Sequence, residues 1–315
     1  MPFTLFKSDR KVRSLADPLA PLLTKPRPAS TTTVPSRQHS SSSLPDAQPA
    51  TGDDGRLGAA GPNLTFTMQE GVFTARLGRA EDAHPGLSRH RIGTVEADGL
   101  TFALEKTVLR GPSKEGAPHR RIALVTGFHG NEPGGPLACG RLYTDFLRDA
   151  TRFAGLELHL YPASNPWGLL FSHRGNAAGH DLAGDFGQGS QEPETRALEE
   201  DFVREQFDTL ITLFTDVASH GLYAYTSEKA FCHDFLIQAI ESARLDFSLP
   251  PGLTFDGFHQ SPINPSEAFP GSPKLPANIL KQPGEILLEL PGRASRQLQG
   301  KAAATIVHAI LERLA

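Results

Sequence analysis

The sequence predicts a single α/β domain whose mixed, largely parallel sheet is covered by helices on both faces. Two observations lead to this prediction. The chain has 315 residues, of which 38% are hydrophobic, so it can bury one full core and still leave a tail. After residue 90, apolar runs typical of buried strands alternate with patterns typical of amphipathic helices, as in folds that place helices on both faces of a sheet.

The first 62 residues differ in composition from the rest of the chain. They are rich in Ser, Thr and Pro, with scattered Lys and Arg, and such a segment buries too little apolar surface to offset its ordering entropy. We therefore expect a disordered tail over 1–62 and a folded domain over 63–315. The composition also fits an organelle transit peptide, although Asp9, Asp17 and the prolines count against it. Because the apolar stretch of a secretory signal is missing, we expect a cytoplasmic protein, with the transit peptide as the alternative.

Antiparallel strands are expected at the start of the domain. Two alternating runs over 64–68 and 72–75 come first, and a second pair of runs flanks Asp98-Gly99. An Asp-Gly step between alternating runs predicts a β-hairpin. The two strands of this hairpin are expected over 91–95 and 100–104. They are followed by a strand ending at Gly127, a helix over 134–149, a strand over 156–161 and a long irregular loop over 162–191.

The rest of the domain continues the alternation of strands and helices. Glu192-Pro193 predicts the start of a helix that runs to about residue 207, because Pro is favoured in the first helical turn. The remaining expected elements are a buried strand over 210–214, an amphipathic helix over 229–245, a proline-rich surface segment over 247–283, a strand over 285–290 and a closing helix over 296–314.

Composition argues against several classes of function. The formal net charge of −4 argues against a nucleic-acid partner. No apolar run reaches the roughly 18 residues that a membrane-spanning helix needs. Cys139 and Cys232 are too few for a disulfide framework or a Cys-based zinc site, and we interpret both as small buried hydrophobic residues. Any metal must therefore be bound by His and carboxylate side chains.

One loop combines a histidine and a glutamate at the end of a predicted strand. Ligands of α/β sheets collect outside the carboxyl ends of the strands, and His129 and Glu132 lie just after Gly127. An imidazole and a carboxylate three residues apart form a pair that a catalytic zinc accepts. An isolated His-x-x-Glu is more often a helix cap beside a solvated carboxylate, so the surrounding motifs decide between the two interpretations.

Those motifs resemble a known family. Gly-Phe-His-Gly-Asn-Glu-Pro at 127–133 is similar to the metal-binding motif of the zinc carboxypeptidase superfamily, particularly its branch near succinylglutamate desuccinylase, aspartoacylase and bacterial murein-peptide amidases. The resemblance covers roughly residues 90 to 315 and implies a carboxypeptidase-like fold. Further motifs in the family's order are Asn165-Pro166-Trp167-Gly168, Arg174-Gly175-Asn176-Ala177, Asp181-Leu182-x-x-Asp185-Phe186, Glu194, Ser219-His220-Gly221-Leu222-Tyr223 and Leu288-Glu289-Leu290-Pro291.

The resemblance implies zinc as cofactor and hydrolysis of an amide bond by metal-activated water. By similarity, His129 and Glu132 are two zinc ligands. Glu289 matches the family's catalytic base, and Arg174 matches the arginine that polarises the substrate carbonyl and stabilises the oxyanion.

Two of these residues also have a purely structural interpretation. Glu289 could end its strand in a surface contact with Arg293. Arg174 could order its own loop by binding Asp181 or Asp185.

The sequence departs from the family at the third zinc ligand, a histidine at the end of the strand over 210–214. Depending on the motif used as anchor, this position falls on Phe214 or on Ala218, and neither side chain can bind a metal. His220 lies two to six residues later in the same loop and is the available substitute. Relatives often have a histidine there that binds no metal, so both interpretations of His220 remain open.

A second departure lies where relatives have an Asn-Arg pair that binds the terminal carboxylate of the substrate. Ala183 and Gly184 occupy these positions and can make neither contact. The two departures argue against ordinary carboxypeptidase activity. The first hypothesis is a zinc-dependent amide hydrolase that acts on a peptide or a small N-acyl amino acid. The alternative is a catalytically impaired member of the family that serves as a binding or scaffold module.

Overall fold

The computed structural model describes residues 57–61, 64–79, 82–114, 116–219, 221–226, 255–260, 275–276 and 278–315, with only the backbone of 57–61 and 255–260. The chain divides into two units, Met1–Pro45 and Asp46–Ala315, and all described residues belong to the second. The helix expected over 229–245 lies outside the described residues, as does nearly all of the expected tail. A first strand at Leu57–Gly61 precedes the domain start expected at residue 63, and the division into tail and domain stays a prediction.

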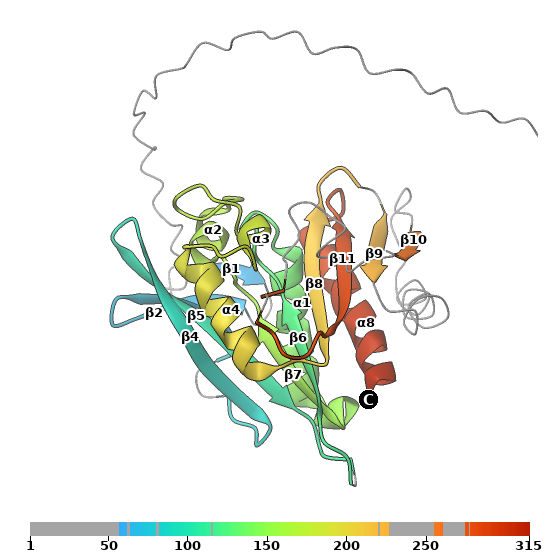
Figure 1. Ribbon diagram of the computed structural model, residues 1–315. Coiled ribbons are helices and arrows are strands. Elements are labelled where there is room, and N and C mark those ends of the chain that lie inside the picture. Colours follow the sequence, from blue (N-terminus) through green and yellow to red (C-terminus); the bar gives the residue numbers. More distant parts are fainter. Residues whose placement is uncertain are drawn as a thin grey trace, which may run out of the picture. The chain divides into compact units, whose positions relative to one another are not determined.

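One mixed sheet organises the second unit (Figure 1). Its hydrogen-bonded order is β1-β2-β3-β5-β7-β6-β8-β11-β9-β10, and β4 pairs with β5. The parallel pairs β7–β6, β6–β8 and β8–β11 form its centre, which confirms the predicted mixed α/β sheet. The strands are β1 (Leu57–Gly61), β2 (Leu64–Gln69), β3 (Val72–Leu77), β4 (Leu87–Ala97), β5 (Leu100–Arg110), β6 (Arg120–Val125), β7 (Leu156–Tyr161), β8 (Thr209–Asp216), β9 (Leu222–Thr226), β10 (Phe255–Gln260) and β11 (Gly284–Pro291).

The domain begins with antiparallel strands, as expected. Pairs β1–β2, β2–β3 and β4–β5 are all antiparallel. The β4–β5 hairpin turns at Asp98 and Gly99, whose φ angles of 52° and 73° lie in the left-handed region that Asp and Gly tolerate. The strand β10 interrupts the proline-rich segment that was expected over 247–283, and it pairs in parallel with β9.

Helices cover both faces of the sheet (Figure 1). The division follows the alternation along β6, where Ile122 and Leu124 pack in one core with α1 and α8, and Ala123 and Val125 pack in a second core with α4. Only Cys139 of the two cysteines is described, and it is buried as a free thiol. The helices are α1 (Gly134–Arg148), the 3₁₀ turn η1 (Ala150–Phe153), α2 (Pro166–Phe171), α3 (Leu182–Asp185), α4 (Pro193–Glu205) and α8 (Arg296–Leu314).

The long loop expected over 162–191 contains two short helices, α2 and α3. Each begins at a residue whose side chain accepts a backbone hydrogen bond: Asn165 Oδ1 from Gly168 N at 2.8 Å, and Asp181 Oδ1 from Ala183 N at 3.2 Å. Helices this short have no apolar periodicity, which is why the sequence pattern indicated a loop. They shorten the irregular part of this span next to the candidate site, because a side-chain cap fixes where each of the two helices begins.

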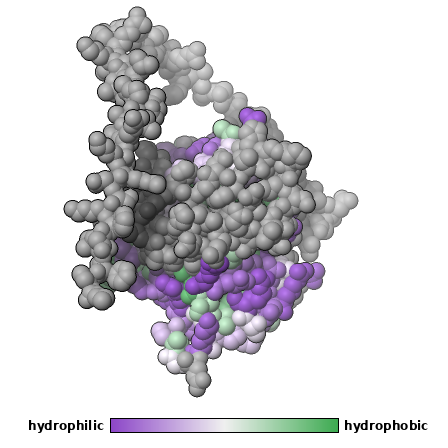
Figure 2. All heavy atoms as spheres, turned by 90° about the vertical axis from the view of Figure 1, so that its right-hand side faces the viewer, coloured by the Kyte–Doolittle hydropathy of each residue, from purple (hydrophilic) through white to green (hydrophobic). Residues whose placement is uncertain are grey.

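The surface of the described residues is mainly polar. Figure 2 shows mostly hydrophilic side chains on the coloured part of one face, with few apolar ones between them. The strongly exposed apolar side chains in the described part of the chain are scattered singly, as on most monomers, and the largest are Met68, Val217 and Leu280. None of the helices described is both long and apolar enough to cross a membrane.

Candidate metal and active site

The predicted site loop follows the carboxyl end of β6 and leads into α1. Within it, Glu132 N donates to His129 O at 3.1 Å, a tight turn that brings the two side chains together. Both side chains are buried, with 5% of His129 and 6% of Glu132 exposed. The loop therefore presents an imidazole and a carboxylate side by side at the edge of the sheet where α/β ligands bind.

Both ring nitrogens of His129 have carboxylate partners. Nδ1 lies 2.8 Å from Glu132 Oε1, and Nε2 lies 3.0 Å from Asp181 Oδ1. Burial alone would lower the pKa of His129, but the hydrogen bonds that the ring donates to the carboxylates of Asp181 and Glu132 outweigh it and raise the pKa to about 9. The imidazole is therefore fixed in orientation, with one nitrogen toward Glu132 and the other toward Asp181.

Glu132 is anchored to the neighbouring strand. Its Oε2 accepts a hydrogen bond from the backbone N of Thr215 on β8 at 2.8 Å. Its Oε1 accepts a hydrogen bond from Arg174 Nη1 at 3.2 Å. Glu132 thus connects the loop after β6 to the end of β8.

Arg174 lies between the two carboxylates of the site. It donates to Glu132 and, through Nη2, to Asp181 Oδ2 at 3.3 Å. The expected ordering contact with Asp181 is therefore present. The side chain is also 54% exposed, so part of the guanidinium remains available to a bound molecule.

Glu289 reaches the same region from β11. It pairs in register with Phe214 on β8 and with Tyr223 on β9. Burial, with the negative charges of Glu132 and Asp216, raises the pKa of Glu289 to about 8, against an opposing effect of His129 and Arg174. A carboxyl group held in this way is protonated below neutral pH and becomes a base just above it.

Phe214 is one of the two positions at which the resemblance would place the third zinc ligand. Its ring centroid lies 5.4 Å from that of His129 and 6.0 Å from that of Phe128, and its side chain is buried. Ala218, the other position considered, follows β8 and donates its backbone N to Asp216 Oδ1 at 2.9 Å. His220 lies outside the described residues, so its distance to His129 stays open.

The region of the missing Asn-Arg pair is apolar. Ala183 is fully buried in the core with Phe128, Phe186 and Phe214, and Gly184 follows it in α3. Neither of these two residues therefore offers a bound molecule a charged side chain.

Two of the described side chains, His129 and Glu132, are of the types that a metal ion accepts as ligands and lie side by side. His129 gives its Nε2 to the carboxylate of Asp181, the arrangement by which many proteins orient a metal-ligating histidine, and its Nδ1 faces Glu132. In the described part of the chain, no group of three or more His, Cys, Asp or Glu residues is arranged to hold a metal ion. A metal ion held by His129 and Glu132 would therefore need a third ligand from outside the described residues.

Asp181 was foreseen only as a partner of Arg174. Its contact with His129 joins residues 52 apart in the sequence, and no local pattern signals such a pair. Its position at the start of the Asp-Leu-x-x-Asp-Phe motif was the available signal.

Comparisons with solved structures agree on the fold. A metallo-carboxypeptidase from Burkholderia cenocepacia matches 73% of this chain and 65% of its own with a TM-score of 0.56 and 18% identity. A metallo-carboxypeptidase from Pseudomonas aeruginosa, in complex with (2-guanidinoethylmercapto)succinic acid, matches 72% of this chain and 64% of its own with a TM-score of 0.52 and 16% identity. Thrombin activatable fibrinolysis inhibitor matches 72% of this chain and 69% of its own with a TM-score of 0.51 and 13% identity.

The chain thus has the α/β fold of the metallo-carboxypeptidases. It spans slightly less than two thirds of the two bacterial enzymes, at 65% and 64% of their lengths. Neither a protein-family sequence model nor a curated protein sequence matches it. The sequence identity to each of these three structures is below 20%, so the comparisons establish the fold of the chain. Any activity has to be argued from the chain's own residues.

Proposed function

We propose that this protein is a zinc-dependent hydrolase of an amide bond in a peptide or an N-acyl amino acid. One observation supports this above the others: His129, Glu132, Arg174 and Glu289 gather at one end of the sheet, and Glu289 has its pKa raised toward neutral pH. A hydrolase of this kind needs metal ligands, a base for water and a cation for the oxyanion.

Each residue has a role in this proposal. His129, Glu132 and His220 would hold the zinc, which when bound lowers the pKa of its water and polarises the scissile carbonyl. Glu289 accepts the proton of the attacking water and later returns it to the leaving amine. Arg174 donates hydrogen bonds to the oxyanion through the exposed part of its guanidinium.

The departure at α3 narrows the substrate class. Because Ala183 is buried among aromatic rings, the substrate does not depend on a charged clamp there for its carboxylate. We therefore expect substrates whose carboxyl group is amidated, or lies elsewhere, to be accepted as well as free acids.

Metal content tests the proposal before any substrate is known. Zinc per chain would be measured by elemental analysis after zinc loading and dialysis, for the unchanged protein and for His129→Ala, His220→Ala and Glu289→Gln. His180→Ala is the matched control, because His180 is 55% exposed and its Nδ1 pairs with Glu192, which is not one of the proposed zinc ligands. We expect about one zinc in the unchanged protein, the control and Glu289→Gln, and clearly less in the other two variants.

Turnover of a peptide and N-acyl amino acid panel is then compared between the unchanged protein and Glu289→Gln. Full zinc in His220→Ala would remove His220 from the ligand set, and no retained zinc in the unchanged protein would end the proposal.

A second candidate, a binding module without catalysis, is favoured by one observation. The Phe214 ring packs against His129 at one of the two positions considered for the third ligand, and an apolar ring beside His129 does not complete a metal centre. Absence of zinc together with measurable binding of the same panel would select this candidate.

A further inference from the structure

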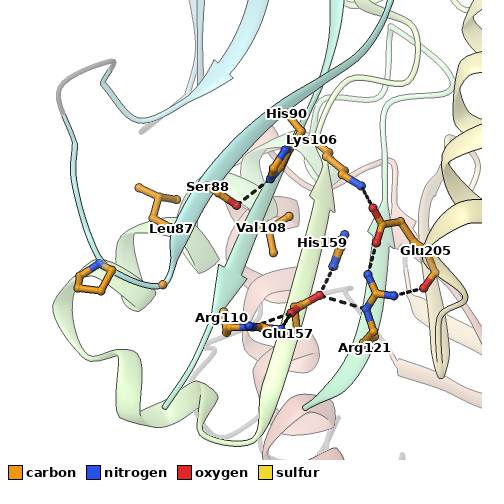
Figure 3. A pocket seen from close by; sticks show the side chains of 12 residues that line it. Leu87, Ser88, His90, Lys106, Val108, Arg110, Arg121, Glu157, His159 and Glu205 are labelled. Carbon is orange, nitrogen blue, oxygen red and sulfur yellow. Dashed lines mark hydrogen bonds and ion pairs between the residues drawn. The ribbon is translucent and has the colours of Figure 1, made fainter. Parts of the chain in front are cut away.

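A pocket lies apart from the candidate active site, on the face of the sheet that α4 covers (Figure 3). It has a volume of about 330 Å³ and is lined by residues of β4, β5, β6 and β7 and by the end of α4. Arg121 and Glu157 line it near the starts of β6 and β7, whereas His129 follows the end of β6. The pocket and the candidate active site therefore lie at opposite ends of the parallel strands.

The hollow forms where a short side chain stands between long ones. Val108 on β5 pairs in register with Ser88 on β4 and with His159 on β7. Lys106 and Arg110 lie two residues to either side of Val108, so their side chains project from the same face of β5. Figure 3 shows these two long side chains at opposite ends of the pocket, with Val108 between them.

The lining carries one more positive than negative charge. Its Lys, Arg, Asp and Glu residues are Lys106, Arg110, Arg121, Glu157 and Glu205. Asp201, which pairs with Lys106 from behind the lining, also pairs with Arg204, so these two residues add one charge of each sign. A ligand with a single negative charge balances the excess, whereas a dianion would leave the pocket negative.

Arg110 is the cation of this lining that a ligand can reach. Its side chain is 58% exposed, compared with 2% for Lys106 and 32% for Arg121. Its Nε donates to Glu157 Oε2 at 2.7 Å and its Nη2 pairs with the same oxygen, while its Nη1 has no partner among the described residues. Arg110 can therefore donate to an added anion without breaking its pair with Glu157.

Ser88 supplies a second donor in the same pocket. Its side chain is exposed, and its Oγ lies 2.8 Å from His90 Nε2. When His90 Nε2–H donates to Ser88 Oγ, the hydroxyl proton remains for an anion. Because Ser88 pairs with Val108, it is a diagonal neighbour of Arg110, and such neighbours lie roughly 7–8 Å apart. One carboxylate and the long arginine side chain together span that gap.

We propose that this pocket binds a small organic acid with one carboxylate, which accepts hydrogen bonds from Arg110 Nη1 and from the Ser88 hydroxyl. A carboxylate forms strong charge-assisted hydrogen bonds with a guanidinium and brings the single negative charge that the lining lacks. The volume lies at the small end of the range for ligand pockets, about 300–1,000 Å³, and fits an acid of amino-acid size. The pocket is separate from the candidate active site, so the proposal does not depend on metal binding or hydrolysis.

Ring nitrogen shifts of His90 provide the test, because its hydrogen bond with Ser88 responds when the hydroxyl turns to a ligand. The full chain is labelled with ¹⁵N-histidine and freed of metal with chelator, and the His90 resonances are assigned from their loss in His90→Gln. Acetate, acetamide and phosphate are titrated separately at pH 8 and constant ionic strength. Acetamide has nearly the shape of acetate without its charge, and phosphate is mainly a dianion at this pH. We expect a saturable shift with acetate, none with acetamide and weaker binding of phosphate than of acetate.

Two charge variants locate the binding. Arg110→Gln should weaken acetate binding at least about tenfold, because it removes the charged donor. Glu157 keeps its contacts with Arg121 and His159 in this variant, so the fold is expected to remain. Arg91→Gln is the matched control: Arg91 is exposed on β4 next to His90 but does not line the pocket, so acetate affinity should stay within about twofold.

A third variant tests the second donor. Ser88→Ala should weaken acetate binding about threefold, as expected for the loss of one neutral hydrogen-bond donor. Absence of a saturable acetate shift, or equal binding of acetamide, would overturn the proposal. Phosphate that binds more tightly than acetate would overturn the assignment of a monoanion, and unchanged acetate affinity in Arg110→Gln would place the binding outside this pocket.

Discussion

Replacement of Glu289 by Gln should stabilise the metal-free protein at alkaline pH. In the folded chain the pKa of Glu289 is raised to about 8, from an ordinary value of 4.5, chiefly by burial and by the charges of Glu132 and Asp216. The folded state therefore holds this proton more tightly than the unfolded state does. As a result, the free energy of unfolding falls as pH rises from about 4.5 to about 8, and the Glu289→Gln substitution removes that dependence.

The size of the effect follows from the same two pKa values. At about 1.4 kcal/mol per pKa unit, the full shift corresponds to an upper limit of about 5 kcal/mol once Glu289 is ionised. Relaxation of the loop and entry of water reduce this, so we expect Glu289→Gln to gain about 2–5 kcal/mol at pH 9 and less than about 1 kcal/mol at pH 5. A buried carboxylate of this kind lowers stability at the pH where it is ionised.

Urea unfolding measures this difference directly, with chelator present to keep the cleft free of metal. Trp167, the single tryptophan, is 8% exposed and reports the transition by fluorescence. Glu200→Gln is the control, because Glu200 is exposed on α4 and its loss should leave the pH dependence as in the unchanged protein. Equal stability of Glu289→Gln and the unchanged protein at pH 9 would refute the assignment of a desolvated, proton-holding Glu289.

Three further outcomes are expected. Lys106→Met should lower the free energy of unfolding in urea by about 3–5 kcal/mol, because Lys106 is 2% exposed and its removal leaves Asp201 buried without this partner. The control Lys281→Met, at an exposed ion pair, should lower it by less than about 1 kcal/mol. Phe214→His should raise zinc affinity at least about tenfold in dialysis assays if the third ligand is missing, and should change little if His220 already serves. Deletion of residues 1–56 should leave the melting temperature within about 2 °C, and a larger drop would show that the segment packs on the domain.

Elements with a long apolar period were predicted well from sequence alone. The closing helix was expected over 296–314 and α8 spans those residues, because its apolar positions repeat along about five turns. Strand β7 likewise matches its expected span over 156–161. The short helices α2 and α3 were missed because caps at Asn165 and Asp181, rather than periodicity, define them.

His129 and Glu132 were predictable because they are neighbours in sequence, whereas Arg174 and Glu289 were predicted from motifs that resemble those of a known family. His129 and Glu132 share one loop, so their spacing alone suggested that they act together. The contact of His129 with Asp181 and that of Lys106 with Asp201 join residues 52 and 95 apart, so only the fold reveals them. The same holds for the pocket at His159, which four strands build together.

The strand β5 has a consequence for how this chain can be dissected. It pairs with β4 along one edge, and along the other with β3 through residues 101–103 and with β7 through residues 107–110. The antiparallel strands and the parallel centre therefore belong to one hydrogen-bonded sheet that is continuous through β5. A fragment that starts after Arg110 would leave the outer edge of β7 with unpaired N–H and C=O groups, a template for strand-to-strand association between molecules. Expression of a fragment without the β1–β5 region is thus expected to give aggregates, and that region has to be kept as part of the domain.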